Sequence, residues 1–329
     1  MRSRRIGACR ALGSTTDEQA RSFDYGIKSE QAHKLGLGMS MNRWFERLGA
    51  SRAACVVGIL LSVSGCASIV SNATSQFADN LSSAILGSND VATVREAIPA
   101  YLVLIDSLVM GESPSPDLLL AAAQLNGAFT NLVEPERAGT LSLKALDYAA
   151  RGACLKSVTL CDLSQLSFKT FSERVESISL KEVAPAYQLA VAWTGWIQAN
   201  SGDWAAVGQL ARVKALMTRV LVLADGFDEG GAHLYMGGLE TVLPASMGGN
   251  PEKGKAHFES AIAYSGGRFL MAKVVYAEQY AKLVFDQALH DALLNSVLAA
   301  DPVAPNLTLI NTLAQERAKQ LMMESNDYF

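Results

Sequence analysis

Apolar residues recur every three or four positions along most of the chain after residue 90, and proline or glycine interrupts them at intervals. The stretch 233–265 shows the pattern most clearly. Leu239 and Leu243 lie near one face of a predicted helix, which Pro244 ends because proline cannot continue the hydrogen-bond ladder. A glycine-rich turn follows, and Pro251 suits the first position of a second helix. This stretch therefore predicts two antiparallel helices joined by a short turn.

The same periodicity predicts helices along the rest of the chain after residue 90. They span residues 91–110, 118–129, 135–151, 168–180, 185–200, 203–223, 234–243, 251–264, 269–281, 285–298 and 307–323. Six of them form three helical hairpins, at 118–150, 185–223 and 234–264. A hairpin of this kind resembles the tetratricopeptide (TPR) repeat, a helix-turn-helix unit of about 34 residues. The sequence thus predicts an all-α fold of TPR-like stacked helical hairpins, of the α-solenoid type.

Two glycines of the second hairpin carry a specific expectation. Gly195 and Gly202 lie at the spacing of the two helix-contact glycines of a TPR repeat. Small residues at such positions let two helices approach closely. We therefore expect Gly195→Leu to destabilise the fold by a few kcal/mol, because a close contact leaves no room for the larger side chain.

Charge is distributed unevenly along the 329 residues, whose formal net charge is −4. Up to Gly65 the chain has ten basic and five acidic residues, and from Cys66 onward it has eighteen basic and twenty-seven acidic ones. An acidic body argues against nucleic-acid binding, which needs lysines and arginines to neutralise phosphates. A targeting signal explains the basic excess of the first part.

The first 65 residues predict a leader and a signal peptide. Residues 1–38 show no sustained periodicity, and we interpret them as an over-extended start, with translation beginning at Met39 or Met41; the alternative is a disordered leader. Residues 39–65 then form a signal peptide, with a basic segment followed by a short apolar run. That run is too short to span a membrane, which needs about 20 apolar residues. Residues 66–90 are expected to be a tether, and residues 91–329 the helical domain.

The signal peptide ends in Val63-Ser64-Gly65-Cys66, which is the lipobox pattern of bacterial lipoproteins. We expect a diacylglycerol lipid on the Cys66 thiol and no other cofactor; the alternative is a cleaved secretory signal with a chance cysteine. Ala67 follows the cysteine in place of aspartate. These residues predict a periplasmic, lipid-anchored protein of the outer membrane of a Gram-negative bacterium.

Cys154 and Cys161 are the remaining cysteines of the expected mature chain. An extracytoplasmic compartment favours a disulfide between them. On one straight helix the two residues would be separated by about 10 Å, so that a bond requires a loop between them. Two buried free thiols are the alternative, and no histidine nearby suggests a metal site.

Candidate chemistry in the expected mature chain points to binding rather than catalysis. It contains three histidines, His233, His257 and His290, and no HExxH, GxSxG, Walker or GxGxxG pattern, so we do not expect an enzyme. The acidic segment 225–231 lacks two ligands of a calcium loop and is interpreted as a turn. Several aromatic residues instead predict a ligand cavity, although each is also a candidate for the core. The expected lining is Trp196, Tyr235, Phe269, Tyr276 and Tyr280, with Arg268 and Lys273 at a mouth able to meet a carboxylate.

The C-terminal half resembles a known family. The similar segments are residues 248–253, 256–259, 273–281, 285–286, 289–290, 301–302 and 327–329. They resemble the TatT component associated with tripartite ATP-independent periplasmic (TRAP) transporters. The resemblance implies a lipid-anchored, TPR-like periplasmic protein that binds a TRAP-type solute-binding protein. It also implies an apolar cavity or pore and a homotrimer. The alternative function is a TPR-like scaffold lipoprotein for cell-envelope assembly that binds no small molecule.

Overall fold

Helices account for all the regular secondary structure of the residues that the structure describes. This computed structural model describes residues 83–111, 114–130 and 132–329, all of which belong to one unit, Val70–Phe329. No strand occurs among them, which confirms the all-α prediction. Cys66 and the predicted signal peptide lie outside the described residues. Within the described part of the chain, no helix combines the length and the hydropathy that a membrane span needs.

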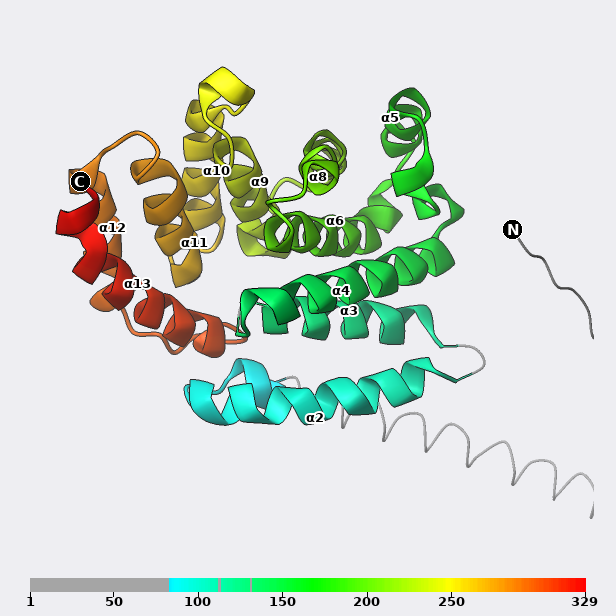
Figure 1. Ribbon diagram of the computed structural model, residues 1–329, viewed down its shortest axis with the longest axis horizontal. Helices are drawn as coiled ribbons and strands as arrows, with labels where there is room; N and C mark the ends of the chain where they lie inside the picture. The colour runs from blue at the N-terminus through cyan, green and yellow to red at the C-terminus, as the bar shows by residue number, and fades with distance from the viewer. Residues whose placement is uncertain (1–82, 112–113, 131) are drawn as a thin grey trace, which may run out of the picture. The chain divides into compact units, whose positions relative to one another are not determined.

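The first four long helices pack in successive layers (Figure 1). They are α2 (Val91–Val109), α3 (Pro116–Thr130), α4 (Pro135–Lys156) and α6 (Val183–Ala199). Asp90 caps α2 by accepting a hydrogen bond from the backbone N–H of Thr93 at 3.0 Å. Small residues let α3 and α4 approach closely. A Cβ added at Gly152 of α4 would lie 2.9 Å from the Leu120 side chain of α3.

A disulfide joins the last turn of α4 to the segment between α4 and α6. This segment consists of η1 (Val158–Leu160), η2 (Leu163–Gln165), α5 (Phe168–Glu176) and η3 (Leu180–Glu182). Helix α4 ends before Ser157, and the turn that follows brings the Cα atoms of Cys154 and Cys161 to 4.4 Å, where the structure joins the two thiols. The loop that such a bond requires is therefore present.

After α6 the chain forms α7 (Trp204–Val207) and α8 (Leu210–Leu223). The prediction of one continuous helix over 203–223 was wrong, because the α-helix is interrupted at Gly208 and Gln209. The expected role of Gly195 was also wrong. A Cβ built at Gly195 or at Gly202 meets no atom within 4 Å, so neither glycine marks a close helix contact.

The close glycine contacts lie instead in the third hairpin. It is formed by α9 (Gly231–Thr241) and α10 (Pro251–Tyr264), with η5 (Ala245–Met247) between them. A Cβ at Gly237 would lie 2.7 Å from the Phe258 ring, and one at Gly254 would lie 2.5 Å from the Thr241 side chain. Glycines on both helices therefore set their separation.

The C-terminal helices pack as a second core. Helix α11 (Leu270–Val275) continues as a π-helix, η6 (Tyr276–Ala281), and is followed by α12 (Gln287–Leu298) and α13 (Thr308–Tyr328). Leu294 of α12 and Leu321 of α13 are fully buried between them. The side chain of Asn311 ties α13 to the start of α11 by accepting from the Leu270 N–H at 3.0 Å and donating to the Arg268 carbonyl at 2.9 Å.

The acidic segment 225–231 is a strained turn that connects four parts of the chain. Within η4 (Phe227–Gly230), Asp228, Glu229 and Gly230 have φ values of 56°, 49° and 90°, all in the left-handed region. Residues with a Cβ atom tolerate this region poorly, and only glycine adopts it freely. Each carboxylate of the turn has a partner on a different element: Asp225 bonds Tyr264 of α10, Asp228 bonds Tyr187 of α6, and Glu229 pairs with Arg268.

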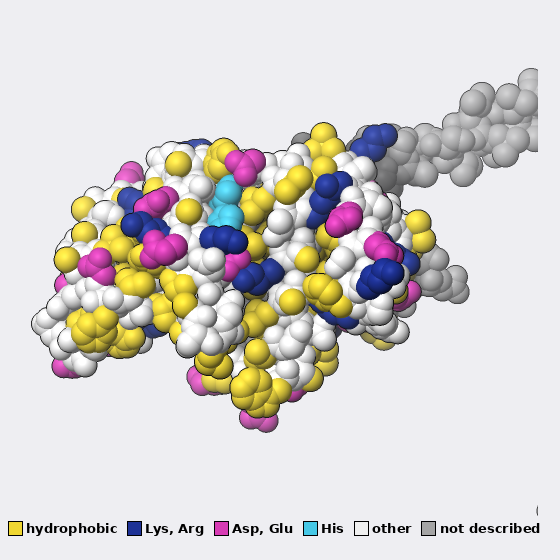
Figure 2. All heavy atoms as spheres, turned by 90° about the horizontal axis from the view of Figure 1, so that it is seen from above, with side chains coloured by type: hydrophobic (Ala, Val, Ile, Leu, Met, Phe, Trp, Pro, Cys, Tyr) yellow, Lys and Arg dark blue, Asp and Glu magenta, His cyan; other side chains and the backbone are white. Residues whose placement is uncertain are grey.

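A histidine pair reinforces the contact between α9 and α10. The Nδ1 atoms of His233 and His257 lie 2.8 Å apart, so that one ring donates its N–H to the lone pair of the other. The His233 ring also stacks on Tyr264, with centroids 5.4 Å apart, and its Nε2 lies 3.2 Å from an Asp225 oxygen. Figure 2 shows histidine side chains reaching the surface, with acidic and basic side chains beside them.

This pair predicts a loss of stability in mild acid. Burial, and then the charge of His233, lower the pKa of His257 below its ordinary value of about 6.5. The unfolded chain therefore binds the proton more tightly, so the stability from the neutral pair is complete above about pH 6.5 and declines as the pH falls below it. His257→Gln removes this titration. We expect urea unfolding to show a smaller decrease in the free energy of unfolding between about pH 6.5 and 5 for the variant than for wild type.

The contribution of the Asp225 carboxylate falls in a different pH window. The hydrogen bond from Tyr264 is the largest effect on the pKa of Asp225 and lowers it, so this contribution is lost only in stronger acid. Equal pH slopes for wild type and His257→Gln between pH 6.5 and 5 would show that the histidine pair does not control acid stability.

Candidate functional site

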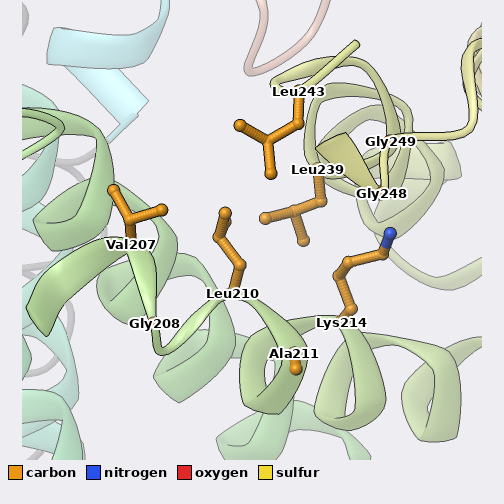
Figure 3. A pocket seen from close by; sticks show the side chains of 9 residues that line it. All are labelled: Val207, Gly208, Leu210, Ala211, Lys214, Leu239, Leu243, Gly248 and Gly249. Carbon is orange, nitrogen blue, oxygen red and sulfur yellow. The ribbon is translucent and has the colours of Figure 1, made fainter. Parts of the chain in front are cut away.

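Two cavities stand out in the described part of the chain, and they differ in chemistry. The first, which we call the apolar cleft, lies between α8 and the end of α9 and has a volume of about 480 Å³. Its lining residues are Val207, Gly208, Leu210, Ala211, Lys214, Leu239, Leu243, Gly248 and Gly249. In Figure 3, Val207, Leu210, Leu239 and Leu243 point toward a common space, while the Lys214 amino group lies at its edge. The cleft therefore has apolar walls and one cationic group.

Local sequence explains how the apolar cleft is built. The interruption at Gly208 separates α7 from α8, so that Val207 and Leu210 both face the cleft. On the opposite wall, Gly248 has a φ of +93°, which favours glycine. A Cβ at Gly249 would lie 1.6 Å from the Leu243 carbonyl oxygen, so a side chain at this position would displace the loop.

Lys214 is held in place by a buried carboxylate. Its Nζ donates to Glu240 Oε2 at 2.7 Å, and the Glu240 side chain is only 8% exposed. A buried carboxylate needs such a partner, because an isolated buried charge is costly. An ammonium group has three N–H donors, so this bond leaves donors for another acceptor at the edge of the cleft.

The second cavity, which we call the tyrosine cavity, lies among α3, α4, α6, η4 and α9 and has a volume of about 290 Å³. Its walls combine small residues, three glutamines, two tyrosines and one carboxylate. They are Ala123, Gln124, Gly127, Ala128, Thr130, Ser142, Ala145, Tyr187, Gln188, Val191, Ala192, Gly195, Gln198, Asp228 and Tyr235. Gly195 thus faces open space in a cavity, which explains why an added Cβ would meet no neighbour.

Asp228 is the charged group of the tyrosine cavity. The Tyr187 hydroxyl donates to its Oδ2 at 2.7 Å, and the rings of Tyr187 and Tyr235 meet edge to face with centroids 6.2 Å apart. Gly231 makes room for this contact, because a Cβ there would lie 2.5 Å from Asp228 Oδ2 and 2.6 Å from the Tyr187 hydroxyl.

Partial burial shifts the pKa values of the ionisable groups in this cavity. Asp228 is exposed as a residue, but neighbouring atoms remove part of the water around its carboxylate, and this desolvation raises its pKa. Burial raises the pKa of Tyr235 to about 12, and the charge of Asp228 adds to the effect. Burial is also the main reason that the pKa of Tyr187 is raised.

The structure does not bring the predicted lining residues into one cavity. Tyr235 lines the tyrosine cavity, and the half-buried Trp196 packs against the large N-terminal core. The other three aromatic residues belong to a separate core cluster around Phe258, in which Tyr276 and Tyr280 are buried and Phe269 is packed against them. Phe269 precedes α11, and Tyr276 and Tyr280 lie on the π-helix, from which their hydroxyls reach glutamates of α10.

The two cationic residues expected at the mouth lie elsewhere. Arg268 is paired with Glu229 at 2.7 Å and donates to the Ser265 carbonyl at 3.1 Å. Neither Arg268 nor Lys273 lines either of the two cavities. Three residues of the cavities, Lys214, Tyr187 and Asp228, were not predicted from the sequence. The acidic residues and glycines of segment 225–231 predict a turn, but they do not predict which residues the turn contacts.

The arrangement of these groups suits binding. The apolar cleft fits an apolar body with an anionic end at Lys214, and the tyrosine cavity presents a carboxylate beside two tyrosines. Among the described residues, no cluster of three or more histidine, cysteine or acidic side chains has the geometry to hold a metal ion.

Comparison with known proteins identifies the family. No curated protein matches the chain. A family model described as TRAP transporter T-component matches residues 87–329, which include all the helices from α2 to α13 and both cavities. Because this match covers well over half of the sequence, the chain belongs to the TRAP transporter T-component (TatT) family.

Proposed function

We propose that this accessory component of a TRAP transport system binds the solute-binding subunit and holds an apolar or amphipathic solute in the apolar cleft. Membership of the T-component family supports the role in a TRAP system. The observation that carries the solute part of the proposal is the apolar cleft itself. It combines a volume of about 480 Å³ with aliphatic walls and a single ammonium group at its edge.

The chemistry of the cleft favours an amphipathic carboxylate. Burying an aliphatic chain against Leu210, Leu239 and Leu243 removes apolar surface from water at about 25 cal/mol per Å². The free N–H donors of Lys214 can then bind a carboxylate head group, which forms a charge-assisted hydrogen bond. Glu240 keeps the ammonium in place when the cleft is empty.

We further propose that the protein lies in the periplasm and that a lipid on Cys66 anchors it to the outer membrane. The sequence Val63-Ser64-Gly65-Cys66 after a basic and apolar leader supports this localisation. An anchor would keep the solute-binding subunit close to the membrane, where a solute is handed over. The family resemblance supports a homotrimer as the assembled form.

The solute proposal predicts that charge at the cleft edge contributes to affinity. A double variant, Lys214→Met with Glu240→Gln, removes both charges and avoids leaving a buried carboxylate unpaired. We expect it to bind decanoate at least about tenfold more weakly than wild type by calorimetry, while the neutral 1-decanol binds both proteins alike. Lys273→Met is the matched control, because Lys273 lies outside both cavities.

Equal decanoate affinity in the double variant and wild type would remove Lys214 from the site. Failure of wild type to bind either decanoate or decanol would overturn the proposal that the cleft holds an amphipathic solute. The scaffold function would then be favoured if partner binding also fails.

The anchor and the partner can be tested together in cells. In wild type we expect the protein and its co-expressed TRAP solute-binding subunit to sediment together with membranes, and labelled fatty acid to be incorporated into the protein. Cys66→Ser should block the label and release the complex from the membranes, because the thiol that accepts the lipid is absent. The two proteins should still co-purify from the soluble fraction.

The lipid anchor and the partner subunit are contradicted by different results. A Cys66→Ser protein that stays on membranes contradicts the lipid anchor. A solute-binding subunit that co-purifies with neither wild type nor variant contradicts the partner.

A further inference from the structure

The tyrosine cavity contains an anion without a matching cation. Among the described residues, Asp228 forms no ion pair, and the cavity lining includes no lysine or arginine. By contrast, the other two carboxylates of the turn each lie beside a basic side chain: Asp225 beside His233 and Glu229 beside Arg268. The single hydrogen bond from Tyr187 satisfies only part of the acceptor capacity of the Asp228 carboxylate.

The chain holds this carboxylate in place at an energetic cost. Asp228 and Glu229 both adopt left-handed backbone conformations that are unfavourable for residues with a side chain. Strain of this kind persists where the surrounding structure enforces it, and it clusters at ligand sites. The contact between Asp228 and Tyr187 also requires glycine at position 231, because a Cβ there would overlap both side chains.

The walls around the carboxylate have the electrostatic character that favours a cation. Tyr187 and Tyr235 meet edge to face at 6.2 Å and both line the cavity, so a ligand there lies against aromatic rings. Aromatic faces attract ammonium groups. The hydrogen bond from the Tyr187 hydroxyl holds the Asp228 carboxylate at the cavity wall, where it can pair with a cation. The three glutamines of the lining supply further neutral acceptors.

We propose that the tyrosine cavity is a binding site for a small organic cation, whose ammonium group pairs with Asp228 beside the rings of Tyr187 and Tyr235. A volume of about 290 Å³ limits the ligand to a small metabolite. The proposal for this site depends only on the tyrosine cavity. It does not depend on the solute proposed for the apolar cleft, because the two cavities share no lining residue.

Choline and its neutral carbon analogue 3,3-dimethylbutan-1-ol test the proposal directly, because the two molecules have nearly the same shape and differ in charge. With the full chain purified in detergent, we expect calorimetry at pH 7.5 to show choline binding at least tenfold more tightly than the neutral analogue. Putrescine serves as a second cation with primary ammonium groups. Acetate, as an anion, should not bind in the tyrosine cavity.

Variants then locate the binding. Asp228→Asn should weaken choline binding at least tenfold, whereas Glu229→Gln, which removes a charge from the same turn outside the cavity, should change it less than twofold. Gly195→Leu provides a test that leaves Asp228 intact. Its side chain would project from α6 into the cavity, where no atom lies within 4 Å of an added Cβ, so we expect normal folding and loss of choline binding.

Circular dichroism and melting temperature establish that each variant is folded. Equal affinity of wild type for choline and its neutral analogue would overturn the cationic specificity. Absence of binding for both choline and putrescine would overturn the site. Choline binding that survives both Asp228→Asn and Gly195→Leu would place the cation outside the tyrosine cavity.

Discussion

The left-handed turn of Asp228, Glu229 and Gly230 is the constraint on which the arrangement of the central helices depends. Holding a residue with a side chain in this region costs on the order of 1–3 kcal/mol, and the turn contains two such residues. Contacts with three other segments offset this cost: the Tyr187 hydroxyl binds Asp228, Arg268 pairs with Glu229, and the Tyr264 hydroxyl binds Asp225, three residues before the turn. The turn thereby links α6, α10 and the loop before α11, and it leads directly into α9.

This turn also relates the two cavities to each other. Helix α9 begins at the turn, where Tyr235 faces the tyrosine cavity, and ends at the apolar cleft, where Leu239 and Leu243 form one wall. Any displacement of α9 therefore changes both cavities.

The sequence predicts the helices well because periodicity and proline positions are local properties. Pro135 and Pro251 each begin a helix where expected, and Pro116 begins α3 two residues before the expected start at 118. The sites were much less predictable, since they depend on which residues face each other across the fold. Gly195 has the spacing of a helix-contact glycine, yet it lines a cavity, while the close contacts fall at Gly237 and Gly254. Tyr276 and Tyr280 are aromatic residues of a core cluster, and no local pattern distinguishes such residues from those that line a pocket.

Native-state hydrogen exchange of Gly230→Ala tests most directly whether the turn organises the central helices. Gly230 has a φ of +90°, and an added Cβ would lie 3.0 Å from the Ala261 backbone of α10, so the variant strains the turn and pushes on its neighbour. Gly202→Ala is the control, because an added Cβ there meets no atom within 4 Å. The account predicts that amides of α6, α9 and α10 lose protection together in Gly230→Ala, by about 1–3 kcal/mol of opening free energy. Protection in these three helices that matches the Gly202→Ala control would contradict it.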